Sequence, residues 1–137
     1  LLALPRQHTH PFPLDMSASP EDIAKAFVQH YYQTFDTNRA AISGLYKDVS
    51  MLSWEGEKYV GSAIGGKLTS ISGDVSHDIK TLDVQPSTSP SALIVFVSGE
   101  VKIGGPNPLR FAEFFQLVST GPGQFYVHNH VMRLNYA

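Results

Sequence analysis

The chain has 137 residues, which suits one domain around a single hydrophobic core. Hydrophobic residues make up 42% of it and charged residues 16%, a composition that excludes a disordered chain. The net charge is -2 and no run of Lys or Arg occurs, which argues against binding to nucleic acid. There is no cysteine for a disulfide or a metal site, and we predict no cofactor. No apolar run approaches the ~18 residues of a membrane span, so membrane insertion is not expected.

Residues 1–18 contain three prolines and show no hydrophobic period. We interpret them as a flexible leader that the fold does not need, with Met16 as a possible natural start. His8 and His10 lie two residues apart in this segment, which is weak support for a metal site. The folded domain is therefore expected to occupy residues 19–137.

A long helix is predicted to begin at Ser19, which can cap it, and Pro20, which fits its first position. Apolar residues then recur every four positions, as in an amphipathic helix that packs on an apolar surface: Ile23, Phe27, Tyr31 and Phe35. Residues 36–38 (Asp-Thr-Asn) end the pattern. A short second helix is expected over 39–43, closed by Gly44.

The strand that follows ends at Trp54, the single tryptophan of the chain. Leu52 and Trp54 lie two apart and therefore share a face, and Glu55-Gly56 makes a turn. A pocket with an apolar wall and a charged rim would have this pattern, but so would a core tryptophan beside a solvated carboxylate. A brief strand over 58–60 and a helix over 62–71 come next. That helix contains Gly65 and Gly66, so we expect it to be loose.

Four longer strands are predicted over 77–85, 92–103, 109–118 and 124–136. Because the helices come first and the long strands afterwards, the fold class is α+β. We expect a cone-shaped domain, in which the long N-terminal helix packs inside a strongly bent antiparallel sheet.

Both faces of these strands are apolar at their centres. An antiparallel sheet with one solvated face should alternate more cleanly between apolar and polar residues. In the last strand, Phe125, Val127 and Val131 are expected to share the second face. A patch centred on Phe96, Phe114 and Val131 would be a sticky surface on a monomer, so we predict a sheet-on-sheet homodimer.

No nucleophile elbow, phosphate loop or dinucleotide fingerprint occurs. The candidates for acid–base chemistry are Glu55, His77, His128 and His130. His128 and His130 are expected to share a face, where they would line a cavity, bind a metal or sit at a wet end of the sheet. Glu113 lies among apolar strand residues, either buried or reaching the rim. A small isomerase or dehydratase would need such a base deep in a pocket.

Four segments resemble the signature segments of the nuclear transport factor 2 family. They are His-Tyr-Tyr-Gln-Thr-Phe-Asp at 30–36, Leu-Ser-Trp-Glu-Gly at 52–56, Asp-Val-Gln-Pro at 83–86 and Arg-Leu-Asn-Tyr at 133–136. The resemblance runs from about residue 23 to 137 and is closest to plant and fungal members. It implies a homodimer without enzyme activity that binds the GDP form of the small GTPase Ran and Phe-Gly nucleoporins. Such a protein carries Ran into the nucleus and is found in the cytoplasm, the nucleus and the nuclear envelope.

The resemblance also implies site residues. A phenylalanine of Ran would enter a cavity at the mouth of the cone, and the family's cavity positions fall on Trp54, Ile71, Val75 and Met132. The rim carboxylate and rim histidine fall on Glu55 and His77. The dimer-interface positions fall on Phe96, Phe114 and Val131, which is the patch that strand parity also selects.

The chain departs from the family at four places. One is Asn-His-Val-Met-Arg at 129–133, where members usually have Asn-Asp-x-Phe-Arg. The chain also has Ile-Ser-Gly at 71–73 in place of Leu-Pro-Phe, and Pro20 in place of an aromatic residue that contacts nucleoporins. The loop at 104–108 carries no charge, where animal and yeast members have an acidic cluster. A second hypothesis is therefore a dimeric scaffold or export-cofactor module that binds Phe-containing peptides or a partner protein. An enzyme similar to ketosteroid isomerase is a third.

Overall fold

The computed structural model describes residues 18–89 and 91–135, so the predictions made for residues 1–17 lie outside the described part. It contains, in chain order, α1 (Pro20–Thr37), the 3₁₀ helix η2 (Arg39–Leu45), β1 (Tyr46–Trp54), β2 (Glu57–Val60), α2 (Ser62–Thr69), β3 (Val75–Pro86), β4 (Ala92–Ile103), β5 (Leu109–Gly121) and β6 (Gln124–Asn135). The predicted α+β class is confirmed. No described helix has both the length and the apolar character to span a membrane.

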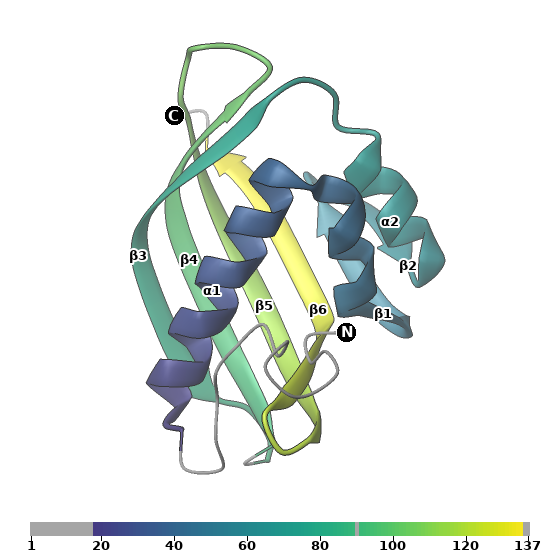
Figure 1. Cartoon of the computed structure of the whole chain (residues 1–137), viewed down its shortest axis with the longest axis vertical. Coiled ribbons are helices and arrows are strands. Elements are labelled where there is room, and N and C mark those ends of the chain that lie inside the picture. The colour runs from purple at the N-terminus through teal and green to yellow at the C-terminus, as the bar shows by residue number, and fades with distance from the viewer. Residues whose placement is uncertain (1–17, 90, 136–137) are drawn as a thin grey trace.

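Helix α1 begins as the sequence predicts. The Ser19 hydroxyl accepts a hydrogen bond from the backbone N–H of Asp22 at 3.1 Å, and Pro20 occupies the first helical position. Figure 1 shows α1 lying across the inner face of the long strands. Its buried residues form one stripe, as the four-residue period requires: Ala24, Phe27, Val28, Tyr31, Tyr32 and Phe35.

The six strands form one sheet in the order β2-β1-β6-β5-β4-β3. Neighbouring strands are antiparallel except β1 and β6, which are parallel, so the prediction of a wholly antiparallel sheet is wrong for this pair. No hairpin joins β1 to β6, because β2, α2, β3, β4 and β5 lie between them in the chain. The connection therefore does not force the two strands to run in opposite directions.

Irregularities in the ladders bend the sheet. The β3–β4 register shifts between Ile79 and Thr81, opposite Gly99. A Cβ atom at Gly99 would lie 2.1 Å from the carbonyl oxygen of Asp78, so no other residue fits there without moving the backbone. A second shift, in β6, skips His128 in the pairing with β5.

The bulge at His128 corrects two predictions about faces. Phe125 and Val127 are buried whereas Val131 is exposed, so the three residues do not share a face. His128 and His130 are separated in the same way, because the extra residue at the bulge breaks the two-residue alternation. His130 is buried in the core, and His128 is half-buried with its ring near the Tyr126 hydroxyl.

The core is aromatic where α1 meets β5. The ring of Phe115 lies 5.0 Å from that of Phe27 and 4.9 Å from that of Tyr31, both in edge-to-face geometry. Burying each of these side chains contributes roughly 1.5–3 kcal/mol. This packing fills the middle of the cone.

The outer face carries the apolar row that the sequence selects. Phe96 pairs with Phe114, and Phe114 pairs with Val131, so the three lie side by side across β4, β5 and β6. Phe96 is 42% exposed and Val131 39% exposed. Met51 and Val60, which pair with each other on β1 and β2, are also exposed. The outer face is thus apolar at its centre and along one side.

Candidate functional site

A narrow apolar pocket of about 10 Å³ lies at one end of the cone. The end of α1, the end of β1 and the strands β3, β4 and β6 contribute its walls, which are lined by Phe35, Trp54, Ile71, Val75, His77, Val101, Ile103 and Met132. Five of these residues were assigned to the cavity or its rim from the sequence: Trp54, Ile71, Val75, His77 and Met132. The other three, Phe35, Val101 and Ile103, were not assigned to it.

Trp54 and Phe35 form the aromatic wall. Their rings are stacked with centroids 6.4 Å apart and planes 4° from parallel. Phe35 is buried, while Trp54 is half-buried, and Lys67 of α2 lies 5.9 Å from the centroid of its ring. The tryptophan therefore combines the two alternatives left open by the sequence, because it packs on the core and also lines a pocket.

Glu55 lies beside the pocket and does not line it. It has a positive φ of 50°, the only such value among non-glycine residues in the described part. Its backbone N–H donates to the Met132 carbonyl at 3.0 Å, and its Oε2 accepts from the Leu134 N–H at 2.7 Å. The positive φ costs about 1–3 kcal/mol, and these two bonds to β6 hold the turn in that conformation. They also fix the carboxylate next to Trp54.

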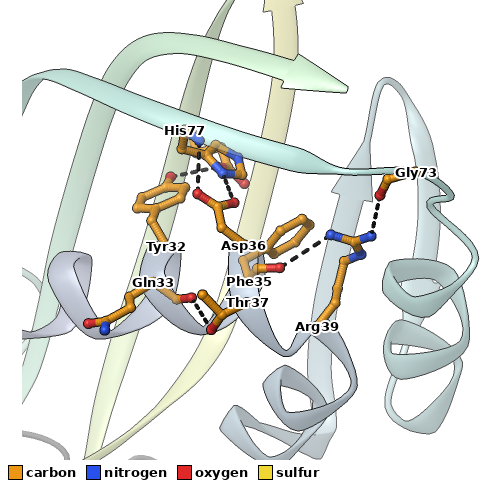
Figure 2. Close-up of polar contacts among 9 residues, drawn as sticks. Tyr32, Gln33, Phe35, Asp36, Thr37, Arg39, Gly73 and His77 are labelled. Atoms are coloured by element: carbon orange, nitrogen blue, oxygen red, sulfur yellow. Dashed lines mark hydrogen bonds and ion pairs between the residues drawn. The ribbon is translucent and has the colours of Figure 1, made fainter. Parts of the chain in front are cut away.

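His77 is held by Asp36 from the last turn of α1 (Figure 2). The two Asp36 oxygens contact the His77 ring at Nδ1 (2.7 Å) and its backbone N–H (2.8 Å). The ring packs against Tyr32, Phe35 and Phe111, with centroids 4.6, 5.2 and 5.3 Å away. His77 is thus a fixed part of the pocket wall, and the pair ties α1 to β3.

A second histidine–carboxylate pair lies deeper in the cone. His130 Nε2 lies 2.5 Å from Glu113 Oε2, and both residues are buried. The Tyr32 hydroxyl donates to Glu113 Oε1, and His130 Nδ1 lies 2.9 Å from the Tyr46 hydroxyl. Tyr31 extends the chain of contacts through its hydroxyl, 2.9 Å from that of Tyr46. The expectation that His130 sits at a wet end of the sheet is therefore wrong, and Glu113 is buried.

The tyrosines of this cluster keep their hydroxyl protons. Burial, the largest cause, raises the pKa of Tyr31, Tyr32 and Tyr46 well above the usual phenol value, and the nearby Glu113 carboxylate raises it further. The Phe115 ring stacks on His130 at 4.3 Å, and neither His130 nor Glu113 lines the pocket at the mouth.

Two glycine-containing loops adjoin the pocket. The Gly104 N–H of the β4–β5 loop donates to the Asp74 carbonyl at 2.8 Å, and a Cβ atom at Gly73 would lie 2.9 Å from the Gly104 Cα. Asp74 and Lys102, one side chain of each charge, line the same surface hollow as Gly73 and Gly104. The loop that is acidic in animal and yeast members is therefore neutral here and close to a lysine. Within the described residues, no group of three or more His, Asp or Glu side chains could hold a metal ion.

This curled sheet with an inner helix and an aromatic pocket at its mouth defines an α+β protein of the nuclear transport factor 2-like fold. The family model described as the nuclear transport factor 2 (NTF2) domain matches residues 23–134. The chain belongs to this family.

Named relatives agree with that assignment. The chain is 51% identical over 117 residues to nuclear transport factor 2 of Oryza sativa subsp. japonica, covering 83% of this chain and 95% of the relative. It is 48% identical over 121 residues to nuclear transport factor 2B of Arabidopsis thaliana, covering 86% and 96%. The structure of nuclear transport factor 2 from Cryptosporidium parvum superposes with a TM-score of 0.80 at 45% identity, covering 85% and 94%. These relatives are named as transport factors, which supports a nuclear transport role.

Proposed function

We propose that this chain binds the GDP form of Ran and carries it into the nucleus, passing the nuclear pore by contact with Phe-Gly nucleoporins. It would then work in the cytoplasm, in the nucleus and at the nuclear envelope. The observation that carries the proposal is the pocket beside Glu55, whose walls are apolar and aromatic apart from His77. A partner with an exposed phenylalanine next to a basic residue complements both features.

The proposed contact with Ran has an apolar part and a charged part, which differ in strength. Burying a phenylalanine side chain contributes roughly 1.5–3 kcal/mol, and Met132 gives the pocket an adaptable wall. Glu55 supplies a negative charge at the rim, but the neutral Gly104-Gly105 loop adds none. Loss of one buried charge pair costs about 2–5 kcal/mol. Binding to Ran-GDP is therefore expected to be weaker than is usual for the family.

Titration calorimetry with GDP-loaded and GTP-loaded Ran tests the proposal. The wild-type protein should bind Ran-GDP weakly and Ran-GTP not at all, because the GTP form holds its phenylalanine elsewhere. Glu55→Lys should abolish binding, and Trp54→Ala should weaken it without unfolding the domain. Glu57→Lys is the matched control, because it makes the same charge change at an exposed position outside the pocket. Gly104→Asp with Gly105→Asp should strengthen binding.

We also propose that the protein is a homodimer through the outer face. The row of Phe96, Phe114 and Val131 would lie at the centre of the interface. Two-fold symmetry would bury one copy of each residue from each subunit. Phe114→Glu should give monomer or aggregate in sedimentation analysis, while Asp83→Asn, at the end of the same row, should leave the dimer intact. A dimer that persists in Phe114→Glu would contradict the assignment.

The second candidate function is a dimeric scaffold or export-cofactor module that binds Phe-containing peptides. The neutral Gly104-Gly105 loop favours it, because such a partner needs an aromatic pocket and no acidic cluster. Wild-type protein that binds neither nucleotide form of Ran, yet captures a Phe-Gly or Phe-x-Phe peptide, would replace the import function with this one.

A further inference from the structure

The α2–β3 connection frames one side of the pocket. It begins after Thr69 and ends at Val75, and it carries Ile71, so two wall residues depend on its position. Arg39, at the start of η2, reaches this connection (Figure 2). One terminal nitrogen of Arg39 donates to the carbonyls of Ile71 and Gly73, each at 3.0 Å. The other donates to the Phe35 carbonyl at 3.2 Å.

The same guanidinium contacts the aromatic wall. Its central carbon lies 5.4 Å from the centroid of the Phe35 ring, and Phe35 in turn stacks on Trp54. Arg39 has no Asp or Glu within ion-pair distance in the described part of the chain. Its charge is therefore directed at three backbone carbonyls, which gives charge-assisted hydrogen bonds that are stronger than neutral ones.

The backbone of the α2–β3 connection is constrained at Gly73, whose carbonyl accepts from Arg39. Gly73 has a φ of +83°, a conformation that side chains rarely adopt, and its Cα lies against Gly104 of the β4–β5 loop. Arg39 thus fixes the connection on one side while Gly104 limits it on the other. The planar, forked guanidinium of Arg39 donates to the carbonyls of Phe35, Ile71 and Gly73 at the same time.

We infer that Arg39 is a positioning residue for the pocket: it holds the α2–β3 connection against the end of α1, and so sets the affinity for a partner's aromatic side chain. The inference rests on the proposed function in that it assigns an aromatic ligand to the pocket. The inference goes beyond that function because it assigns a role to Arg39, which does not itself line the pocket.

The test compares Arg39→Lys and Arg39→Gln with Lys25→Gln, which removes a positive charge from the exposed side of α1. Lysine keeps the charge at residue 39 but loses the fork. Because Trp54 is the single tryptophan, acrylamide quenching of its fluorescence reports on the pocket of the free protein. Calorimetry with Ran-GDP measures the affinity, and thermal unfolding measures stability.

We expect Arg39→Lys to increase quenching of Trp54 and to weaken Ran-GDP binding by about tenfold, the order of one lost charge-assisted hydrogen bond. Arg39→Gln should do the same or more, and Lys25→Gln should match wild type. A purely structural role would lower the melting temperature while leaving quenching and affinity per folded molecule unchanged, and this result would overturn the inference.

The two proposals fail separately. If wild-type protein does not bind Ran-GDP, the import function is wrong, and Trp54 quenching in the free variants then decides the role of Arg39. If wild type binds and Arg39→Lys binds equally well, the positioning role is wrong whatever the quenching shows. Should Arg39→Gln fail to fold, circular dichroism would reveal it, and Arg39→Lys alone would carry the comparison.

Discussion

The molecule contains two histidine–carboxylate pairs that connect the sheet to α1, and their surroundings differ. At the mouth, the side chains of His77 and Asp36 are 6% and 20% exposed, and His77 lines the pocket. In the core, those of His130 and Glu113 are 0% and 3% exposed and contact tyrosines of α1 and β1. Tyr32 joins the two regions, since its hydroxyl bonds Glu113 while its ring packs on His77.

The difference indicates a division of roles. Every polar atom of the inner pair has a partner within a packed core, so its contribution is to stability and to a single arrangement of α1 in the cone. The outer pair is partly exposed to solvent, and it fixes a wall of the pocket. Breaking the inner pair should therefore lower stability most, whereas breaking the outer pair should change the pocket more than the fold.

The largest effect is expected for Glu113→Ala. It leaves the Tyr32 hydroxyl and His130 Nε2 without their acceptor in the core, and removal of one partner of a buried pair costs about 3–5 kcal/mol. Urea denaturation of the variant and wild type measures the loss. Glu113→Gln, which keeps an acceptor oxygen, is the matched control and should lose less. A loss below about 1 kcal/mol would show that water satisfies these groups.

Alkaline pH should act on the same cluster. Tyrosine in the unfolded chain loses its proton near pH 10, whereas burial raises the pKa of Tyr31, Tyr32 and Tyr46 in the folded protein. The stability from these groups is thus complete below about pH 10 and falls as the pH rises further, by about 1.4 kcal/mol per pH unit for each tyrosine. Phenolate absorbance and circular dichroism should change together for these three residues. Reversible ionisation in the folded state would contradict the prediction.

The outer pair should give a smaller loss of stability and a larger change at the pocket. Asp36→Ala removes two hydrogen bonds from a partly exposed carboxylate, for which about 1.5–3 kcal/mol is the expected cost. Acrylamide quenching of Trp54 should rise, because His77 loses its fixed position beside Phe35. Asp22→Ala, on the first turn of the same helix, is the control for quenching. Equal quenching in Asp36→Ala and wild type would contradict the assigned roles.

Much of the fold follows from local patterns. The cap at Ser19 and the spacing of Phe27, Tyr31 and Phe35 predict α1 because each depends on residues within one or two helical turns. Strand parity also selected Phe96 and Phe114 correctly as outward-facing, since no bulge intervenes between them and the centres of their strands. Alternation in β1 put Leu52 and Trp54 on one face, and the family resemblance assigned Trp54 to the pocket.

The parts that the sequence did not predict depend on long-range register. The bulge at His128 decides that His130 turns inward to Glu113 and that Val131 turns outward, and no residue at 128 signals it. The parallel β1–β6 pair joins strands that lie far apart in the chain. The Arg39 contacts join residues 32 and 34 positions apart, and a carbonyl acceptor leaves no signal in the sequence.

The smallest effect is expected at the far end of α1 and provides a reference for both pairs. Ser19→Ala removes the cap on the Asp22 N–H and should cost about 1 kcal/mol in urea denaturation. Because the cap lies at the opposite end of the helix from Phe35 and Asp36, quenching of Trp54 should equal that of wild type. If Ser19→Ala raised quenching as Asp36→Ala does, any loss of helix stability would open the pocket. The outer pair would then affect the pocket only by stabilising α1. The two pairs would differ only in how much they stabilise the fold.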